Sequence, residues 1–284
     1  MLSRVPPVWL VVVGIASVQL GAAIAKDLFD DADPLTLVWL RLATSAVVLT
    51  AAVRPTLRGR TPVDWRVAIA FGIVLGTMNW AIYESFARIP LGIAVTIEFL
   101  GPLGLAVAGS RRARDLVWVL LAATGVGLLG VERGDLTAAG VGFALLAGAA
   151  WTAYILLSAS TGRRWPGLDG LTVASVVATM MIAPFLLVFS RRGLGDPHVL
   201  ALGALVGLLS SVVPYSCEMT ALRTIRPSVF GILMSLEPAA AALAGIVIVH
   251  EFLSALQWLA VACVISASVG ATRTETRLTA PAPD

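Results

Sequence analysis

The chain has 284 residues, of which 58% are hydrophobic and 13% are charged, and its formal net charge is +3. A soluble domain carries about 25% charged residues, so this composition excludes a single soluble globule. The mean hydropathy is +0.91, which indicates an integral membrane protein. The basic residues do not indicate nucleic-acid binding, because they occur in short clusters between apolar segments.

Ten apolar segments follow one another along the chain, most of them close to the ~20 residues that a helix needs to cross a ~30 Å hydrocarbon core. We therefore predict an all-α membrane protein with ten transmembrane helices and almost no extramembrane domain. The predicted spans are Val8–Ala25, Leu35–Val53, Trp65–Phe86, Leu91–Gly109, Leu116–Val131, Ala138–Ser158, Leu171–Phe189, Val199–Leu222, Ser228–Val249 and Ala255–Ala271.

The basic residues predict the orientation of these spans. With the N-terminus inside, fourteen of them fall in cytoplasmic segments and five fall outside, while Arg41 lies within a span. Cytoplasmic loops carry the excess of lysine and arginine in membrane proteins. We therefore expect both termini in the cytoplasm of a cell (inner) membrane. Arg191 and Arg192 are the local exception, since they fall in an outer loop.

The two halves of the chain repeat each other. The stretch WVLLAATGVGLLG at Trp118–Gly130 matches WLAVACVISASVG at Trp258–Gly270, and Gly72 and Gly76 are matched by Gly203 and Gly207. Five spans in each half is an odd number, so the second half enters the membrane from the opposite side, as in transporters with inverted repeats.

This symmetry sets the expected domain boundaries. Residues 1–131 form the first five-helix repeat and residues 132–271 the second. Residues 272–284 are expected to form a disordered cytoplasmic tail. The recurrence of a GxxxG pair at equivalent places predicts close helix packing there, because small residues let helix backbones approach in lipid.

Two acidic residues lie deep in predicted spans, Glu98 in the fourth and Glu237 in the ninth, and prolines follow them at Pro102 and Pro238. An ionised carboxylate at the bilayer centre costs roughly 3 kcal/mol, so it persists only beside protein or trapped water. We expect both glutamates to line a midplane cavity, where they bind a substrate ammonium or couple a proton. The prolines are expected to loosen the helix and free carbonyl groups. The alternative is a structural carboxyl that is protonated or hydrogen-bonded to a neighbouring helix.

Other polar residues inside spans are candidates for the same cavity. Arg41 is expected to snorkel or to pair with an acidic residue of its own half, which is a structural role. His250 and Glu251 lack a third metal ligand nearby, and no phosphate-binding loop is present, so we expect no metal and no nucleotide or other cofactor. The expected substrate-binding residues are Glu98, Glu237, Asn79, Tyr83, Tyr215, Ser210, Gln19 and Tyr154.

Four stretches carry a resemblance to a known family: SVQLGAAIAKDLF at 17–29, PLGIAVTIEFLGPL at 90–103, PYSCEMTAL at 214–222 and GILMSLEPAAAALAG at 231–245. They resemble the EamA-type drug/metabolite transporter superfamily, and most closely the bacterial threonine and homoserine exporters. The resemblance implies ten helices in two inverted five-helix repeats around a cavity lined by the third, fourth, eighth and ninth helices. It also implies export of small amphiphilic metabolites, chiefly amino acids, driven by the proton gradient.

The leading hypothesis is therefore a proton-coupled exporter of small amino acids that works by alternating access, with Glu98 and Glu237 as the proton-coupling residues. An exporter of another amphiphilic metabolite or drug is the alternative within this fold. An intramembrane enzyme is disfavoured, because no Gly-x-Ser-x-Gly motif is present and both histidines lie at span edges. A non-transporting membrane partner is disfavoured by the lack of an extramembrane domain. The sequence leaves the substrate, the coupling ion and the existence of a homodimer open.

Overall fold

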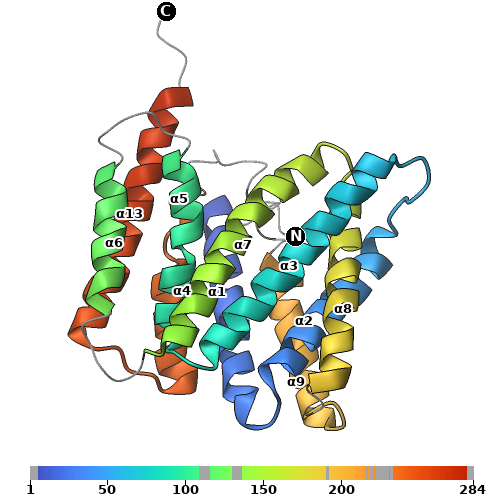
Figure 1. Cartoon of the computed structure of the whole chain (residues 1–284), viewed down its shortest axis with the longest axis horizontal. Helices are drawn as coiled ribbons and strands as arrows, with labels where there is room; N and C mark the ends of the chain where they lie inside the picture. Colours follow the sequence, from blue (N-terminus) through green and yellow to red (C-terminus); the bar gives the residue numbers. More distant parts are fainter. Residues whose placement is uncertain are drawn as a thin grey trace, which may run out of the picture.

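The computed structural model describes residues 6–108, 116–129, 136–189, 192–214 and 233–279, together with Cys217, Ala221 and Phe230. The described chain is helical, and Figure 1 shows the helices side by side with connecting segments at two ends. The elements are α1 (Pro7–Asp27), the 3-10 turn η2 (Leu28–Asp30), α2 (Pro34–Val53), α3 (Pro62–Phe86), α4 (Leu91–Glu98), α5 (Leu100–Ala108), α6 (Leu116–Leu129), α7 (Ala138–Gly162), α8 (Asp169–Phe189), α9 (Pro197–Gly207), the π-helical turn η4 (Leu208–Val212), α12 (Glu237–Ala244), the π-helical turn η5 (Gly245–Val249) and α13 (Ala255–Thr279).

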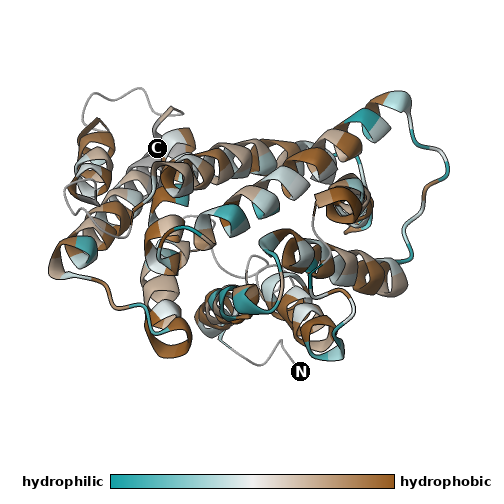
Figure 2. Cartoon of the chain, turned by 60° about the horizontal axis from the view of Figure 1, so that its bottom comes forward, coloured by the Kyte–Doolittle hydropathy of each residue, from teal (hydrophilic) through white to brown (hydrophobic). Residues whose placement is uncertain are grey.

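Ten apolar helical segments are present in the described part of the chain. Five of them, including α1, α2 and α3, are long and apolar enough to cross a membrane, and five are shorter. Figure 2 shows that the helices are mostly hydrophobic, while hydrophilic residues gather at helix ends and in connecting segments. Large apolar side chains such as Val188 (73% exposed) and Val247 (72% exposed) point outward, as lipid-facing residues do. The predicted all-α membrane fold is confirmed.

Local sequence signals explain where several helices begin. Proline is the first residue of α1, α2, α3 and α9, a position where its missing N–H has no helical partner in any case. At the start of α3, the Thr61 side chain accepts from the Asp64 backbone N–H while the Asp64 side chain accepts from the Thr61 N–H. Such a capping box satisfies two backbone donors that would otherwise have no partner.

The two GxxxG pairs pack as predicted, and they do so at equivalent interfaces. A side chain at Gly72 or Gly76 would collide with α8, where Val177 and Met181 lie. A side chain at Gly203 or Gly207 would collide with α2. The third span thus packs closely on the seventh, and the eighth span packs closely on the second. These two interfaces are equivalent, because the third and eighth spans occupy matching places in the two halves, as do the seventh and second spans.

Other helix contacts follow the same pattern. The third span, α3, contacts the sixth span, α7, and its counterpart in the second half, formed by α9 and η4, contacts α1. Three helices also contact the equivalent helix of the other half: α2 contacts α8, α4 contacts α12, and α6 contacts α13. A pseudo-twofold axis in the membrane plane requires this arrangement.

The structure differs from the sequence prediction at both the fourth and the last span. The fourth span is two helices, because α4 ends at Glu98 and α5 begins at Leu100. The last helix continues to Thr279, beyond the predicted end of the tenth span at Ala271. Threonine and arginine are compatible with a helix when a long apolar segment precedes them and supplies the helical nucleus. Residues 280–284 lie outside the described chain.

Candidate functional site

A cavity of about 400 Å³ lies at the centre of the bundle, between helices of both halves. Its wall contains acidic, basic and neutral polar side chains among aromatic and aliphatic ones. Of the residues singled out from the sequence, the lining includes Gln19, Arg41, Asn79, Glu98, Pro102, Tyr154, Ser210 and Glu237. The structure therefore brings together most of the predicted polar set from eight segments of the chain.

Glu98 lies where the fourth span breaks. It is the last residue of α4, and its side chain is half-buried at the cavity wall. Pro102 lines the same wall and has no N–H to donate to the Glu98 carbonyl four residues earlier. Helix α7 approaches this turn closely, since a Cβ on Gly148 would lie 2.6 Å from the Glu98 carbonyl oxygen and a Cβ on Gly101 would overlap the Gly148 carbonyl. Two glycines thus permit the backbone contact that holds the break against α7.

Glu237 lies at a different kind of helix end. It is the first residue of α12, it follows a turn at Ser235 and Leu236, and it is 6% exposed. Pro238 comes next and is buried, but it does not line the cavity. In the first turn of a helix the N–H that proline lacks would have no helical partner. Pro238 is therefore compatible with the start of α12, and its role in loosening the turn between residues 233–234 and α12 stays a prediction.

Three neutral polar side chains at the cavity wall have buried atoms without a hydrogen-bond partner in the described structure. These atoms are Gln19 Oε1, Asn79 Oδ1 and Ser210 Oγ. The Asn79 amide nitrogen donates to the Leu75 carbonyl at 2.8 Å, which fixes the orientation of its side chain. Unsatisfied buried polar atoms are rare in native proteins. Their concentration here makes this wall the most polar buried part of the cavity lining.

Two predicted site residues are not placed at the cavity wall. Tyr83 is 0% exposed and is not part of the lining. Its ring packs against Phe29 and Phe86, with centroid separations of 6.3 Å and 5.7 Å, so it supports the wall from behind. Tyr83 is therefore placed behind the cavity wall rather than at it, and direct substrate binding by Tyr83 stays a prediction. Tyr215 lies outside the described residues.

Arg41 occupies the wall of the cavity rather than the membrane interface. Its Nη2 donates to the Ser210 carbonyl at 3.2 Å, and its guanidinium lies over the Tyr83 ring, 5.8 Å from the centroid. Its Nε is buried and has no partner in the described structure. Arg41 lines the same cavity as Glu98, an acidic residue of its own half. The side chain lines the cavity rather than reaching an interface, and the structural role expected for Arg41 stays a prediction.

The cavity also contains residues that the sequence did not single out. The tenth span contributes Ser268 and Ala271, and the segment before α12 contributes Phe230 and Met234. The cavity is therefore lined by more helices than the third, fourth, eighth and ninth that the family resemblance implies. Ser268 lies 2.7 Å from Ser235 across the two spans, and the only signal in the sequence was a small polar residue inside an apolar segment.

One end of the bundle is held by a charged cluster around the only lysine of the chain. Lys26 Nζ lies 2.5 Å from Glu251 Oε1 and donates to the Ile89 carbonyl at 2.7 Å. Glu251 Oε2 accepts from the Leu91 backbone N–H at 2.8 Å, and Leu91 is the first residue of α4. This cluster, Lys26, Glu251, Ile89 and Leu91, joins the end of α1 to the start of α4 and to the segment before α13.

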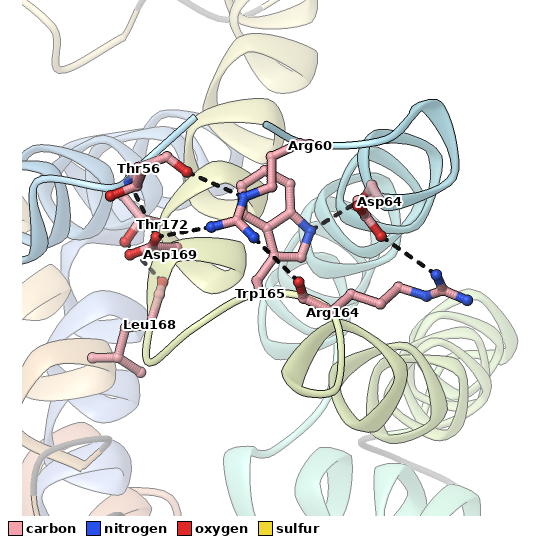
Figure 3. A network of polar contacts seen from close by, with 8 residues as sticks. All are labelled: Thr56, Arg60, Asp64, Arg164, Trp165, Leu168, Asp169 and Thr172. Carbon is pink, nitrogen blue, oxygen red and sulfur yellow. Dashed lines mark hydrogen bonds and ion pairs between the residues drawn. The ribbon is translucent and has the colours of Figure 1, made fainter. Parts of the chain in front are cut away.

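The opposite end is held by the network in Figure 3, which joins the α2–α3 connection to the α7–α8 connection. Arg60 lies 3.8 Å from Asp169 and 4.8 Å from the centre of the Trp165 ring. Asp169 also accepts from the Thr56 N–H at 3.0 Å. Asp64 accepts from Arg164 at 3.4 Å, and its carbonyl accepts from Trp165 Nε1. These contacts tie four helices of the two halves together at one end.

Within the described chain, no group of three or more histidine, cysteine, aspartate or glutamate side chains is placed to hold a metal ion. The chemistry of the cavity is that of reversible hydrogen bonding and ion pairing. It combines one guanidinium, two carboxyl groups, neutral hydrogen-bonding atoms and aromatic walls such as the Phe99–Trp151 pair, whose ring centroids lie 5.0 Å apart.

Residues 138–273 match the family described as the EamA-like transporter family. The chain is 40% identical over 281 residues to the threonine/homoserine exporter RhtA of Escherichia coli strain K12, covering 95% of this chain and 94% of that protein. It is 38% identical over 280 residues to the threonine/homoserine exporter RhtA of Salmonella typhimurium strain LT2, covering 96% and 94%. A solved crystal structure that is 18% identical superposes with a TM-score of 0.66 over 95% of this chain and 99% of that one, which shows the fold alone.

Proposed function

This chain belongs to the EamA-like transporter family, and we propose that it exports threonine, homoserine or similar small amino acids across the bacterial inner membrane. The observation that carries this proposal is a central cavity in which a guanidinium, two carboxyl groups and neutral polar atoms face one space. The two named relatives, at 38% and 40% identity over nearly their whole length, support the same substrate class.

An amino-acid zwitterion needs an acceptor for its ammonium group and donors for its carboxylate. Glu98 and Glu237 are the acceptors in this proposal, with Asn79 and Ser210 as neutral partners and Tyr154 and Gln19 as walls. Protonation of a glutamate from outside competes with the substrate for the same carboxyl group. That competition couples the inward flow of protons to the outward flow of amino acid.

Alternating access requires that each end of the bundle open in turn around the cavity. The cluster around Lys26 and Glu251 closes one end in this proposal, and the network around Arg60 and Asp169 closes the other. The excess of arginines at the Arg60 end supports a cytoplasmic location for that end and for both termini. The export cycle breaks one set of contacts while the other remains formed.

Flux in proteoliposomes tests the proposal. We expect the purified protein to move labelled threonine and homoserine, and we expect an imposed proton gradient to accelerate that movement. Glu98→Gln and Glu237→Gln should each abolish acceleration by the gradient. Glu84→Gln is the matched control, because Glu84 pairs with Arg88 outside the cavity and such pairs contribute little. If a proton gradient accelerates transport by both cavity variants as much as by the wild-type protein, the proposed coupling mechanism is wrong.

A growth-protection screen separates this substrate from another amphiphilic metabolite or drug. Cells that express the protein would be exposed to an excess of each amino acid and of toxic analogues. Protection confined to threonine, homoserine and their analogues is the expected result. Protection against unrelated compounds only would show that the protein is an exporter but that threonine and homoserine are not its substrates.

A further inference from the structure

Arg41 is a cation deep in the membrane whose hydrogen-bonding capacity is largely unused. It lies seven residues into α2, about 10 Å along the helix axis at 1.5 Å per residue. A guanidinium has five N–H donors, and in the described structure one of them has a protein acceptor, the Ser210 carbonyl. Charged residues at this depth are expensive and mark substrate pathways. The Ser210 carbonyl and the Tyr83 ring are its contacts in the described structure, and they leave most of its N–H donors available to a bound molecule.

Glu98 shares the cavity with Arg41, and the two side chains do not form an ion pair within the described residues. Opposite charges in one low-dielectric space attract strongly and pair when the geometry allows it. Here α2 and the break after α4 hold them at separate places on the wall of one cavity. A molecule that carries both a carboxylate and an ammonium satisfies both groups at once.

The neutral atoms around this pair complete the match to a small amino acid. Gln19, Asn79 and Ser210 line the same wall, and side chains of these types can hydrogen-bond a side-chain hydroxyl. Guanidinium is also the group that binds carboxylates in a bidentate manner, which adds geometric specificity to charge. Asn79 and Ser210 alone would offer neutral hydrogen bonds and could not distinguish an amino acid from its amide.

We propose that Arg41 binds the carboxylate of the transported amino acid while Glu98 binds its ammonium group, so that Arg41 determines specificity for amino acids over the corresponding amides and amines. This inference rests on the proposed function and names the group that selects the substrate. It replaces the structural role that the sequence indicates for Arg41.

Binding measured by calorimetry in nanodiscs tests the inference, with L-threonine and L-threoninamide as ligands. The amide keeps the ammonium and the side-chain hydroxyl and loses the carboxylate. We expect the wild-type protein to bind threonine roughly 10- to 100-fold more tightly than threoninamide, as for one lost charged hydrogen-bonding partner. In Arg41→Met the two affinities should agree within a few-fold. Arg41→Lys should retain part of the preference, because it keeps the charge and loses the planar fork.

Arg66→Met is the matched control, because Arg66 is exposed at the start of α3 and does not line the cavity. It should keep the wild-type ratio of the two affinities. An Arg41→Met protein that retains the wild-type ratio would overturn the inference. So would a wild-type protein that binds both ligands equally, or an Arg41→Lys protein with the full wild-type ratio if Arg41→Met does not fold. A wild-type protein that binds neither threonine nor homoserine would overturn the proposed function and this inference with it.

Discussion

Glu98 and Glu237 occupy matching places in the two halves of the chain, but they lie at opposite ends of their helices. Glu98 is the last residue of α4 and Glu237 is the first residue of α12. The two carboxyl groups therefore lie on opposite sides of the interruptions in their spans. A match between repeats predicts where acidic groups lie and does not predict that they act alike.

The burial of the two glutamates also differs. Glu98 is half-buried at the cavity wall and shares it with Arg41, whereas Glu237 is 6% exposed. The break beside Glu98 is also held from outside by the Gly101–Gly148 contact with α7. We expect the first-half glutamate to contribute more to substrate binding than the second-half glutamate, while both take part in coupling.

The largest effect is expected from Gly101→Ala, which would break the first-half site by disturbing its backbone. The new Cβ would overlap the Gly148 carbonyl oxygen, and overpacking against a backbone atom that cannot turn away costs about 3 kcal/mol. The measurement is the thermal stability of the purified protein in detergent. Gly142→Ala on α7 is the control, because nothing lies within 4 Å of its added Cβ. Equal stability of the two variants would show that the contact with α7 is not required.

Glu98→Gln and Glu237→Gln sharpen the comparison directly. We expect Glu98→Gln to weaken threonine binding roughly 10- to 100-fold, because a charged acceptor for the ammonium is lost. Glu237→Gln should change the dissociation constant by no more than a few-fold, while it still abolishes acceleration by a proton gradient. Both dissociation constants are measured in nanodiscs. If the two variants weaken binding equally, then the two halves contribute alike to the substrate site.

Glu251→Gln tests how Glu251, in the second half of the chain, supports the start of α4 in the first half. Glu251 accepts from the first N–H of α4 and pairs with Lys26, and the charged form makes both bonds stronger. We expect a change of a few-fold in the rate of threonine transport and a smaller change in its affinity. Lys26→Met should act through the same pair, so the double variant should resemble either single one. Additive effects would mean that the two side chains act separately.

The smallest effect is expected from the prolines. Pro102→Ala restores a donor that can bond the Glu98 carbonyl, so it should straighten the break and slow transport by about a few-fold. Pro238→Ala should leave transport within about twofold of wild type, because proline in the first turn removes no helical bond. The rates of threonine movement in proteoliposomes give the comparison. A larger loss in Pro238→Ala than in Pro102→Ala would reverse the roles assigned to them.

Features that depend on local pattern were predictable from the sequence. The apolar segments predict the spans, and the recurrence of Gly72 and Gly76 as Gly203 and Gly207 predicts two tight interfaces that the structure contains. A proline four residues after Glu98 and another directly after Glu237 also mark the two interrupted spans. Each of these signals acts over a few residues, where periodicity, small side chains and missing donors have direct physical consequences.

Features that depend on contacts between the halves were not predictable in the same way. The side chain of Arg41 turns to a carbonyl 169 residues later, and Glu251 bonds an N–H 160 residues earlier. Span depth alone could not tell a side chain that snorkels from one that faces a cavity. The same limit applies to Tyr83, which shares a helix face with Asn79 but is covered by Phe29 and Phe86.

The chain contains a single lysine, and the structure places it in the contact with Glu251. An amine-reactive acylating reagent therefore has one side-chain target in the whole protein. That target is 11% exposed while the contact is formed, and the reagent gains access when this end opens. The extent of acylation, followed by mass spectrometry with and without substrate, would report the opening of this end in native protein without an engineered label.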